Sequence, residues 1–422
     1  MDIYKIKGGK KLRGDIPVSG AKNAALPIIV ASLLADGETE LNNVPDLVDI
    51  RTIIKVIEYI GAVSEFDAEN KTLKINTRSV TNAKIPYDLV KVMRASIYVM
   101  GPLLARIGEA EVSLPGGCAI GERPVDIHLA GFEAMGAKID IEHGYIKAAA
   151  EKLSGAKFIM KKVSVGATAN LMMAAVLADG ETVLENCAKE PDIIDLGNFL
   201  IKMGSDIDGL GTDTIKIKGV KKLRPAVYSI MPDRIEAGTY LLAGAITRGE
   251  VRITNVIPEH LEACVQALTE MGFSISSGSD WVKIEPGKTL RGTIVRTTPY
   301  PGFPTDLQAP MMSLMATIPG ISVIIETIFE KRYTHVAELR RMGADITLEG
   351  DVAIIRGTDI LKSATVMMSD LRAGASLVLA ALAGDNETEI RRIYHSDRGY
   401  EKLYEKLSAA GADIKREKGG KS

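Results

Sequence analysis

Residues 171–207 read LMMAAVLADGETVLENCAKEPDIIDLGNFLIKMGSDI, and this stretch holds the pattern from which the fold follows. It opens with the apolar run Leu171–Ala178, which has no polar face and therefore predicts a helix buried on all sides. An Asp-Gly turn and the strand-like run Glu181–Leu184 come next. A second, amphipathic helix then runs to Gly204, where Gly-Ser-Asp-Ile ends the helix and begins another strand.

The same order of elements recurs six times along the 422 residues. Each copy ends in a marker glycine, and neighbouring markers lie 68 to 75 residues apart. The markers are Gly61, Gly136, Gly204, Gly272, Gly343 and Gly411. The wholly apolar helices expected before them span Ala24–Leu34, Ile97–Leu104, Leu171–Ala178, Tyr240–Ile246, Met311–Ala316 and Ser376–Ala383. A spacing kept this constant indicates an internal repeat.

Six units in one chain of this length divide naturally into two groups of three. The segment Lys221–Asp233 contains two prolines and falls between the third and fourth units, so we place the joint there. Two similar domains with a cleft between them are expected, and such clefts are common ligand sites.

Composition excludes several classes of function. The chain is 46% hydrophobic and 25% charged with a net charge of -2, which gives no general attraction to nucleic acid or to an acidic membrane. The N-terminus does not read as a signal peptide, and no apolar run is long enough for a membrane span. Three distant cysteines argue against disulfides and zinc, so we expect a cytoplasmic protein. No Walker loop or strand-linked GxGxxG is present.

Charged residues stand at the starts of helices that are otherwise apolar, where packing does not explain them. They recur in register with the repeat, and those with a positive charge are Lys22, Arg94, Arg123, Arg332, Arg372 and Arg398. Helix N-termini favour anions, and arginine forks bind carboxylate and phosphate through paired hydrogen bonds. For any one of these residues an ordinary surface cation is an equal alternative, but their shared register favours an anion-binding cleft.

Asp306 is the acidic exception, and it lies in the proline-rich loop Tyr300–Pro310. It could be a simple helix N-cap, which aspartate often is. It could also be a base in a cationic cleft, where neighbouring arginines would keep its carboxylate ionised. The composition of the loop is compatible with both roles.

Cys118 lies between glycines in the loop Leu114–His128, five residues before Arg123 and just ahead of a helix expected from Pro124. A nearby arginine favours the thiolate, although an ordinary thiol is mostly protonated at neutral pH. Cys118 can therefore donate a proton or attack as a nucleophile, and a harmless exposed thiol is the alternative. Cys187 and Cys264 lie among apolar residues and are expected to be packed. His128 is one turn into the helix, where a structural role is more common than a ligand contact.

Several motifs together resemble the UDP-N-acetylglucosamine 1-carboxyvinyltransferase family of enolpyruvyl transferases, across essentially the whole chain. They are Ser19–Ala24, Pro115–His128, Lys162–Ala167, Tyr300–Asp306 and Asp370–Arg372. The resemblance implies an α/β fold, the two-domain inside-out α/β barrel built from six βαβαββ units. It also implies that the N-terminal strand joins the second domain. The domains would then be 20–230 and 231–422 with 1–19.

The resemblance further implies transfer of the enolpyruvyl group of phosphoenolpyruvate to the 3′-hydroxyl of UDP-N-acetylglucosamine, with release of phosphate, as the first committed step of peptidoglycan synthesis. Cys118 would be the acid and Asp306 the base, with Lys22 and Arg398 also in the catalytic group. Phosphate would contact Lys22, Arg123 and Arg398, and the carboxylate Arg332 and Arg372. The UDP-sugar would be held or its site ordered by Asn23, Arg94, Arg123, Pro124, Val125, Asp126, Ile127, His128, Lys162, Val163, Ser164, Val165, Ile328 and Asp370.

No cofactor or metal is expected, apart from a covalent phosphoenolpyruvate or pyruvyl adduct on Cys118. Fosfomycin, which alkylates the loop cysteine of this family, should act there. The expected partners are the two small-molecule substrates, with no nucleic acid and no membrane, and the protein should be a monomer. The charged tail Lys415–Ser422 is expected to be disordered.

Three other functions compete with this one. A 3-phosphoshikimate 1-carboxyvinyltransferase has the same fold but lacks the cysteine loop. RNA 3′-phosphate cyclases use related repeat units, yet this chain has no basic stripe with interleaved aromatics. A purely structural repeat protein would leave the charged helix starts unexplained.

Overall fold

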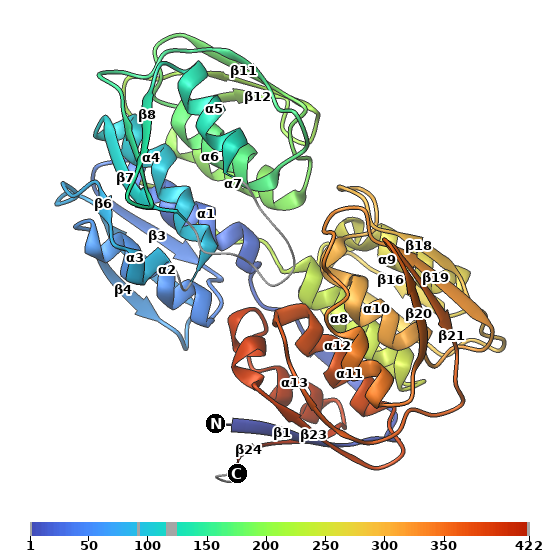
Figure 1. Cartoon of the computed structure of the whole chain (residues 1–422). Coiled ribbons are helices and arrows are strands. Elements are labelled where there is room, and N and C mark those ends of the chain that lie inside the picture. Colours follow the sequence, from blue (N-terminus) through green and yellow to red (C-terminus); the bar gives the residue numbers. More distant parts are fainter. Residues whose placement is uncertain (1, 91–92, 115–124, 420–422) are drawn as a thin grey trace. The chain divides into compact units, whose positions relative to one another are not determined.

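The computed structural model describes residues 2–90, 93–114 and 125–419 of the chain. These residues divide into two compact units, each with its own internal contacts. The N-terminal unit comprises residues 20–90, 93–114 and 125–231, and the C-terminal unit comprises residues 2–19 and 232–419. Among the described residues, the chain passes between the units at 19–20 and at 231–232. Figure 1 labels the elements of each unit.

The N-terminal unit contains three four-stranded sheets of one design. In each sheet, in the order given below, the first strand is parallel to the second, and the third strand pairs antiparallel with both the second and the fourth. The first sheet has β14 (Val227–Ser229), β3 (Glu38–Asn42), β5 (Thr72–Asn76) and β4 (Val63–Asp67). The second has β6 (Lys84–Ile85), β7 (Glu109–Ser113), β9 (Tyr145–Ala149) and β8 (Lys138–Glu142). The third has β10 (Lys157–Ile159), β11 (Glu181–Glu185), β13 (Thr214–Lys218) and β12 (Asp206–Asp208).

The C-terminal unit repeats this design three times. Its first sheet has β2 (Arg13–Pro17), β15 (Glu250–Thr254), β17 (Trp281–Glu285) and β16 (Ser274–Ser277). Its second has β18 (Ile294–Arg296), β19 (Ile321–Ile325), β21 (Val352–Arg356) and β20 (Asp345–Glu349). Its third has β22 (Thr365–Met367), β23 (Glu387–Arg391), β1 (Asp2–Lys7) and β24 (Asp413–Lys418). The six repeats predicted from the marker glycines are thus six copies of one βαβαββ unit, and the described strands close no single barrel.

Each repeat contributes one buried helix and one amphipathic helix. The buried helices are α1 (Lys22–Ala31), α4 (Met100–Arg106), α6 (Val165–Ala175), α8 (Arg234–Ile246), α10 (Gln308–Met315) and α12 (Leu371–Leu382). The second helices are α2 (Val48–Tyr59), α5 (Asp126–Ala134), α7 (Pro191–Met203), α9 (Glu262–Glu270), α11 (Val336–Arg341) and α13 (Leu403–Ala409). Short helical turns are η1 (Ser32–Leu34), α3 (Tyr87–Val90), η2 (Arg94–Val99), η3 (Pro258–Leu261), η4 (Thr305–Leu307) and η5 (Ile393–Arg398). No described helix is long and apolar enough to cross a membrane.

The buried helices form the core of each unit because they have no polar face to offer to water. In the C-terminal unit α8, α10 and α12 pack against one another, as Figure 1 shows. In the N-terminal unit α6 packs against α4 and α5, while α1 packs against α7. The amphipathic helices end as predicted, because all six marker glycines adopt a positive φ of 82° to 108° just after their helices.

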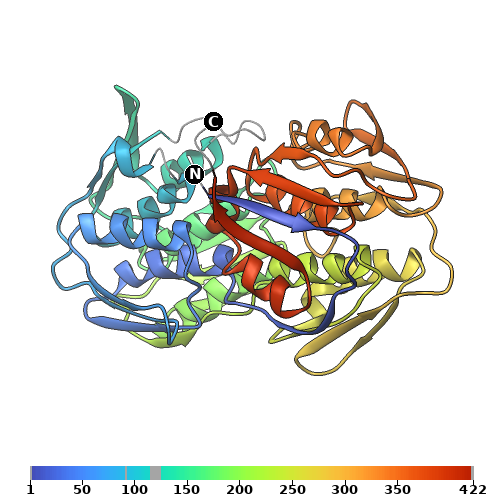
Figure 2. The same cartoon turned by 90° about the horizontal axis from the view of Figure 1, so that it is seen from below.

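Two features of the fold differ from the sequence-based expectation. Five of the six buried helices begin earlier than their predicted apolar runs, as α6 does at Val165, because polar residues such as Asn170 are themselves buried and hydrogen-bonded. The exception is α4, which begins at Met100, three residues into its run. The tail was expected to be disordered from Lys415, but residues 413–418 form β24. This strand pairs along its whole length with β1, and Figure 2 shows β1 running beside the strands of the C-terminal segment.

Asp195 of α7 holds the end of the N-terminal unit in place. Its carboxylate accepts hydrogen bonds from the Tyr228 hydroxyl at 2.7 Å and from the Met231 amide at 3.2 Å. Burial raises the pKa of Asp195 to about 6, although the two hydrogen bonds oppose this rise. The folded protein therefore holds a proton on this group at pH values where the unfolded chain has lost it.

This raised pKa predicts a pH-dependent stability. As the pH rises from 5 to 7, Asp195 should lower the unfolding free energy of the wild type by about 1 kcal/mol. The reason is that the folded state loses the proton on Asp195 over this range, whereas the unfolded state has already lost it. Asp195→Asn has no such proton, so its loss over the same range should be smaller by that amount. Urea unfolding of both proteins at pH 5, 6 and 7 measures the difference, and parallel pH profiles would contradict it.

Candidate active site

Asp306 lies between two arginines in the C-terminal unit. It belongs to η4, whereas Arg332 follows β19 and Arg372 is the second residue of α12. Arg332 donates from Nη2 to Asp306 Oδ1 at 2.6 Å. Arg372 donates to Asp306 Oδ2 from Nε at 3.2 Å and from Nη2 at 2.9 Å. Three segments that are distant in sequence thus converge on one carboxylate.

Both guanidinium groups are almost completely buried, with side-chain exposures of 5% for Arg332 and 4% for Arg372. Burial lowers the pKa of Arg372, but the charge of Asp306 outweighs this effect and the pKa is raised overall. A buried charge is expensive unless it is paired and hydrogen-bonded, so the cluster needs the negative charge of Asp306. The cations expected around Asp306 are therefore Arg332 and Arg372.

The cluster has donors left over. Arg332 Nε and Arg372 Nη1 are buried and have no partner with hydrogen-bond geometry among the described residues, although the Tyr400 side chain is close enough to Arg372 to help raise its pKa. Buried donors are rarely left without a partner in folded proteins, and each such group calls for an explanation. Two guanidinium N–H groups close to one carboxylate suit a second, planar anion such as another carboxylate.

Asp370 fixes the position of Arg372. It is the N-cap of α12, and its Oδ1 accepts from the amides of Arg372 and Ala373 at 3.0 Å each. Its Oδ2 accepts from the hydroxyl of Thr334 at 3.0 Å. Burial raises the pKa of Asp370, but these hydrogen bonds and the charge of Arg332 outweigh burial, so the pKa is lowered. The sequence grouped Asp370 with the residues that hold or order the UDP-sugar site, and the structure shows it as a helix cap.

The remaining predicted residues of this unit lie nearby in the fold. Arg398 is the last residue of η5, which packs against α12, and its side chain is half-buried. Ile328 follows β19 and is half-buried, and its amide donates to Glu326 Oε1 at 2.8 Å.

The N-terminal unit carries the other predicted residues. Lys22 and Asn23 open α1, and Lys22 Nζ lies 3.5 Å from the buried carboxylate of Asp49. Arg94 opens η2. The helical turn η2 packs against both α1 and α6, so these three elements form one cluster in this unit.

His128 is buried in α5 and bonded to Asn170 of α6. Asn170 Nδ2 donates to His128 Nδ1 at 3.1 Å and to Ile97 O at 2.9 Å, while its Oδ1 accepts from the Gly101 amide at 2.8 Å. This hydrogen bond joins His128 of α5 to α6. Next to it, Val125 and Ile127 are buried and Asp126 is exposed in the first turn of α5.

The predicted run Lys162–Val165 leads into α6. Ser164 is the N-cap, because its hydroxyl accepts from the Ala167 amide at 3.2 Å. Lys162 is exposed, and Val163 and Val165 are half-buried. Ser164 therefore has a local structural role as the N-cap of α6. The exposed side chain of Lys162 places a positive charge near the start of this helix.

Cys118, Arg123 and Pro124 lie outside the residues that the structure describes, so their assignments remain predictions. The other two cysteines are packed as expected. Cys187 is 1% exposed and Cys264 is 2% exposed. Burial raises the pKa of Cys187 to about 11 and that of Cys264 to about 12.

Brief alkylation with iodoacetamide at pH 7.5 should therefore modify Cys118 and spare Cys187 and Cys264, because only a thiolate that solvent can reach reacts quickly. Mass spectrometry of tryptic peptides measures this selectivity, and the same reaction in urea should label all three cysteines. Rapid labelling of Cys187 or Cys264 in the folded protein would contradict the expectation.

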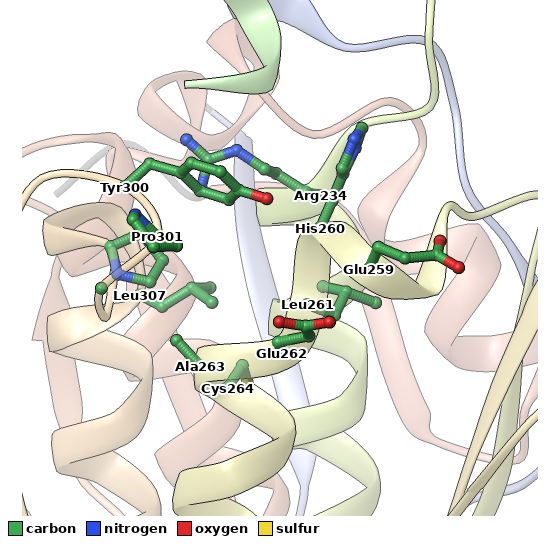
Figure 3. A pocket seen from close by; sticks show the side chains of 12 residues that line it. Arg234, Glu259, His260, Leu261, Glu262, Ala263, Cys264, Tyr300, Pro301 and Leu307 are labelled. Carbon is green, nitrogen blue, oxygen red and sulfur yellow. The ribbon is translucent and has the colours of Figure 1, made fainter. Parts of the chain in front are cut away.

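A pocket in the C-terminal unit lies beside the loop that leads to Asp306 (Figure 3). The guanidinium of Arg234 lies 5.6 Å from the ring centre of Tyr300 there. Its lining also includes His260, Cys264 and Leu307. None of the residues predicted to bind substrate lines this pocket, so it is distinct from the cluster around Asp306.

Sequence reasoning missed two residues that contact the site. Glu326 follows the last residue of β19 and is 3% exposed, and Thr305 directly precedes Asp306. Thr305 Oγ1 accepts from Arg332 Nη1 at 3.0 Å and donates to Glu326 Oε2 at 2.8 Å. A glutamate at the end of the apolar run Ile321–Ile325 was a signal that could have pointed to Glu326.

Known proteins resemble this chain over nearly its whole length. It is 55% identical over 99% of its length to all of the "UDP-N-acetylglucosamine 1-carboxyvinyltransferase" of Geobacter metallireducens. It is 51% identical to "UDP-N-acetylglucosamine 1-carboxyvinyltransferase 1" of Caldanaerobacter subterraneus subsp. tengcongensis, over 98% of this chain and 99% of that protein.

Solved structures agree on the fold. The enolpyruvyl transferase NikO from Streptomyces tendae matches 98% of both chains with a TM-score of 0.87 and 26% identity. An EPSP synthase from Acinetobacter baumannii matches 99% of this chain and 100% of its own with a TM-score of 0.77 and 19% identity, which supports the fold alone. The profile of the family "EPSP synthase (3-phosphoshikimate 1-carboxyvinyltransferase)" matches residues 6–407. The fold, its six repeats and these matches together show that the chain belongs to the EPSP synthase family of enolpyruvyl transferases.

Proposed function

We propose that this protein transfers the enolpyruvyl group of phosphoenolpyruvate to the 3′-hydroxyl of UDP-N-acetylglucosamine and releases phosphate, the first committed step of peptidoglycan synthesis. The observation that carries the proposal is the buried cluster of Asp306, Arg332 and Arg372, in which a carboxylate and two unused guanidinium donors lie together. The choice of acceptor is supported by the names of the relatives at 51% to 55% identity.

The residues fit an addition followed by an elimination. In the addition, the thiol of Cys118 gives its proton to the methylene carbon of phosphoenolpyruvate. The sugar oxygen bonds to the neighbouring carbon while its proton passes to Asp306. In the elimination, the C–O bond to phosphate breaks as the proton on Asp306 passes to the leaving phosphate, and a methyl proton returns to the Cys118 thiolate, which restores the double bond and both side chains. General acid and base groups of this kind typically contribute about 10²–10⁴-fold each.

Positive charge is needed where phosphoenolpyruvate carries its anions. We assign the carboxylate to Arg332 and Arg372, whose spare N–H groups are Nε and Nη1. We assign the phosphate to Lys22, Arg123 and Arg398. The residues assigned to the UDP-sugar, or to ordering the site around it, are Asn23, Arg94, Arg123–His128, Lys162–Val165, Asp306, Ile328 and Asp370.

Cys118 is also the proposed position of a covalent phosphoenolpyruvate adduct and of alkylation by fosfomycin. No further cofactor is proposed. We place the enzyme in the cytoplasm as a monomer, and the free, buried thiols of Cys187 and Cys264 fit a reducing compartment.

A 3-phosphoshikimate acceptor is the second candidate, because the matching family bears that enzyme's name. Phosphate release from phosphoenolpyruvate, measured with each acceptor and with none, separates the two. The proposal expects turnover with UDP-N-acetylglucosamine and background rates otherwise. Turnover with 3-phosphoshikimate, or equal release without an acceptor, would overturn it.

A further inference from the structure

Glu326 is a buried carboxylate whose hydrogen-bond partners all act as donors. Its Oε1 accepts from the Thr297 hydroxyl at 2.9 Å, the Ile328 amide at 2.8 Å and the Phe329 amide at 3.1 Å. Its Oε2 accepts from the Thr305 hydroxyl at 2.8 Å. These four bonds link the ends of two neighbouring strands, β18 and β19, to the loops that carry Asp306 and Arg332.

The bond to Thr305 orders the neighbouring cluster. A hydroxyl has one proton, and the proton of Thr305 is committed to Glu326, so its lone pairs face Arg332 Nη1 at 3.0 Å. The same guanidinium then donates from Nη2 to Asp306 at 2.6 Å. The chain of contacts from Glu326 through Thr305 and Arg332 therefore ends on the carboxylate proposed as the base.

The two amide bonds order a second element of the site. They hold the segment that follows β19, in which Ile328 is a proposed contact of the UDP-sugar. The Arg332 amide donates to Phe329 O at 3.3 Å, and its guanidinium lies 5.2 Å from the Phe329 ring centre. Through these neighbours, one carboxylate acts on both the backbone and the guanidinium of Arg332.

Position 326 requires a carboxylate because of the number of hydrogen-bond donors around it, not because of the shape of the space that the side chain fills. A glutamine fills the same space but brings an NH₂ group that cannot accept from a hydroxyl or an amide. Only a side chain that accepts at both oxygens satisfies all four donors in their present orientation. Packing alone would have been served by an apolar residue at lower cost, because burying a charge is expensive.

We propose that Glu326 is a positioning residue for enolpyruvyl transfer, acting through Thr305 and Arg332 on Asp306 and through the Ile328 and Phe329 amides on the acceptor side. This inference rests on the proposed function. It predicts a loss in turnover from a change at Glu326, which does not itself contact the charged cluster, and from a change at Thr305, which contacts the cluster through Arg332.

The test compares Glu326→Gln, Thr305→Val and Thr305→Ser. Thr388→Val is the matched control, because Thr388 is a fully buried threonine of the same unit whose hydroxyl has no hydrogen bond within the described residues. Glu326→Gln and Thr305→Val should each lower kcat by about 10–100-fold, since small displacements of reacting groups cost this much. Thr305→Ser and Thr388→Val should keep kcat close to the wild type.

The double variant of Glu326→Gln and Thr305→Val tests whether the two residues act as one relay. Its kcat should be only slightly lower than the kcat of the less active single variant, because the effects of substitutions within one network do not add. Thermal melting and circular dichroism give the folded fraction, by which every kcat is corrected. A corrected kcat at the wild-type level in Glu326→Gln and Thr305→Val would overturn the inference, as would a full loss in Thr305→Ser.

The wild type, assayed with both acceptors, separates this inference from the proposed function. If it turns over 3-phosphoshikimate instead of UDP-N-acetylglucosamine, the proposed function is wrong. The same comparison of variants with that acceptor still decides the role of Glu326, because Asp306 and Arg332 belong to the cluster whichever acceptor is used.

Discussion

Asp306→Asn should lower kcat for phosphate release by about 10³-fold, because an amide cannot accept the proton of the sugar hydroxyl. The KM for phosphoenolpyruvate should not rise, since Arg332 and Arg372 then lose the carboxylate that now occupies their N–H groups. Steady-state kinetics with both substrates measures the two parameters separately.

A control is needed because the substitution also removes the counter-charge of two buried arginines. Asp195→Asn is the matched variant, since Asp195 is likewise a hydrogen-bonded carboxylate, 7% exposed, but belongs to α7 of the N-terminal unit. It should change stability and leave kcat nearly intact. A kcat for Asp306→Asn within tenfold of the wild type, at equal folded fraction, would remove Asp306 as the base.

Lys406→Met should reduce the unfolding free energy by about 3–5 kcal/mol, because it leaves a buried carboxylate without its cation. Glu236 is 2% exposed, and its Oε1 accepts from Lys406 Nζ at 2.7 Å. Its Oε2 accepts from the Ser19 amide at 2.8 Å. Lys406 Nζ also donates to the Ser19 hydroxyl at 2.7 Å, so the pair ties the last residue of the N-terminal segment to α8 and α13.

The loss should depend on pH. Burial raises the pKa of Glu236 and the charge of Lys406 opposes that rise, so the pKa must rise further when the lysine is gone. Protonation then relieves the unpaired charge, and the destabilisation should shrink as pH falls. Urea unfolding at pH 5 and pH 8 measures this.

Two comparisons make the result specific. Lys5→Met removes a solvent-exposed ion pair between Lys5 and Glu417, whose side chains are 35% and 42% exposed, and should leave the unfolding free energy nearly unchanged. Combining Lys406→Met with Glu236→Gln should recover part of the loss, because the buried charge is then absent. A loss no larger for Lys406→Met than for Lys5→Met would show that the buried pair does not stabilise the fold.

Much of the candidate site was visible in the sequence because the repeat itself marks helix starts. Asp306, Arg332 and Arg372 were singled out by their register, and the structure brings these three together. Glu326 was missed because its role depends on four hydrogen-bond donors that come from three separate segments of the chain. No local sequence pattern shows that these donors meet at one carboxylate. The pairing of Glu236 with Lys406 has no signal in the sequence either, because the two residues lie 170 positions apart.

The sequence by itself determined the repeat, the buried helices and the glycines that end their partners. These features depend on residues a few positions apart, through helical periodicity and the left-handed backbone that glycine adopts freely. Tertiary structure alone decided that the charged tail becomes β24 and pairs with β1 at the far end of the chain. It also decided which buried charges meet. Such contacts depend on where distant segments come together in space, which no spacing along the chain records.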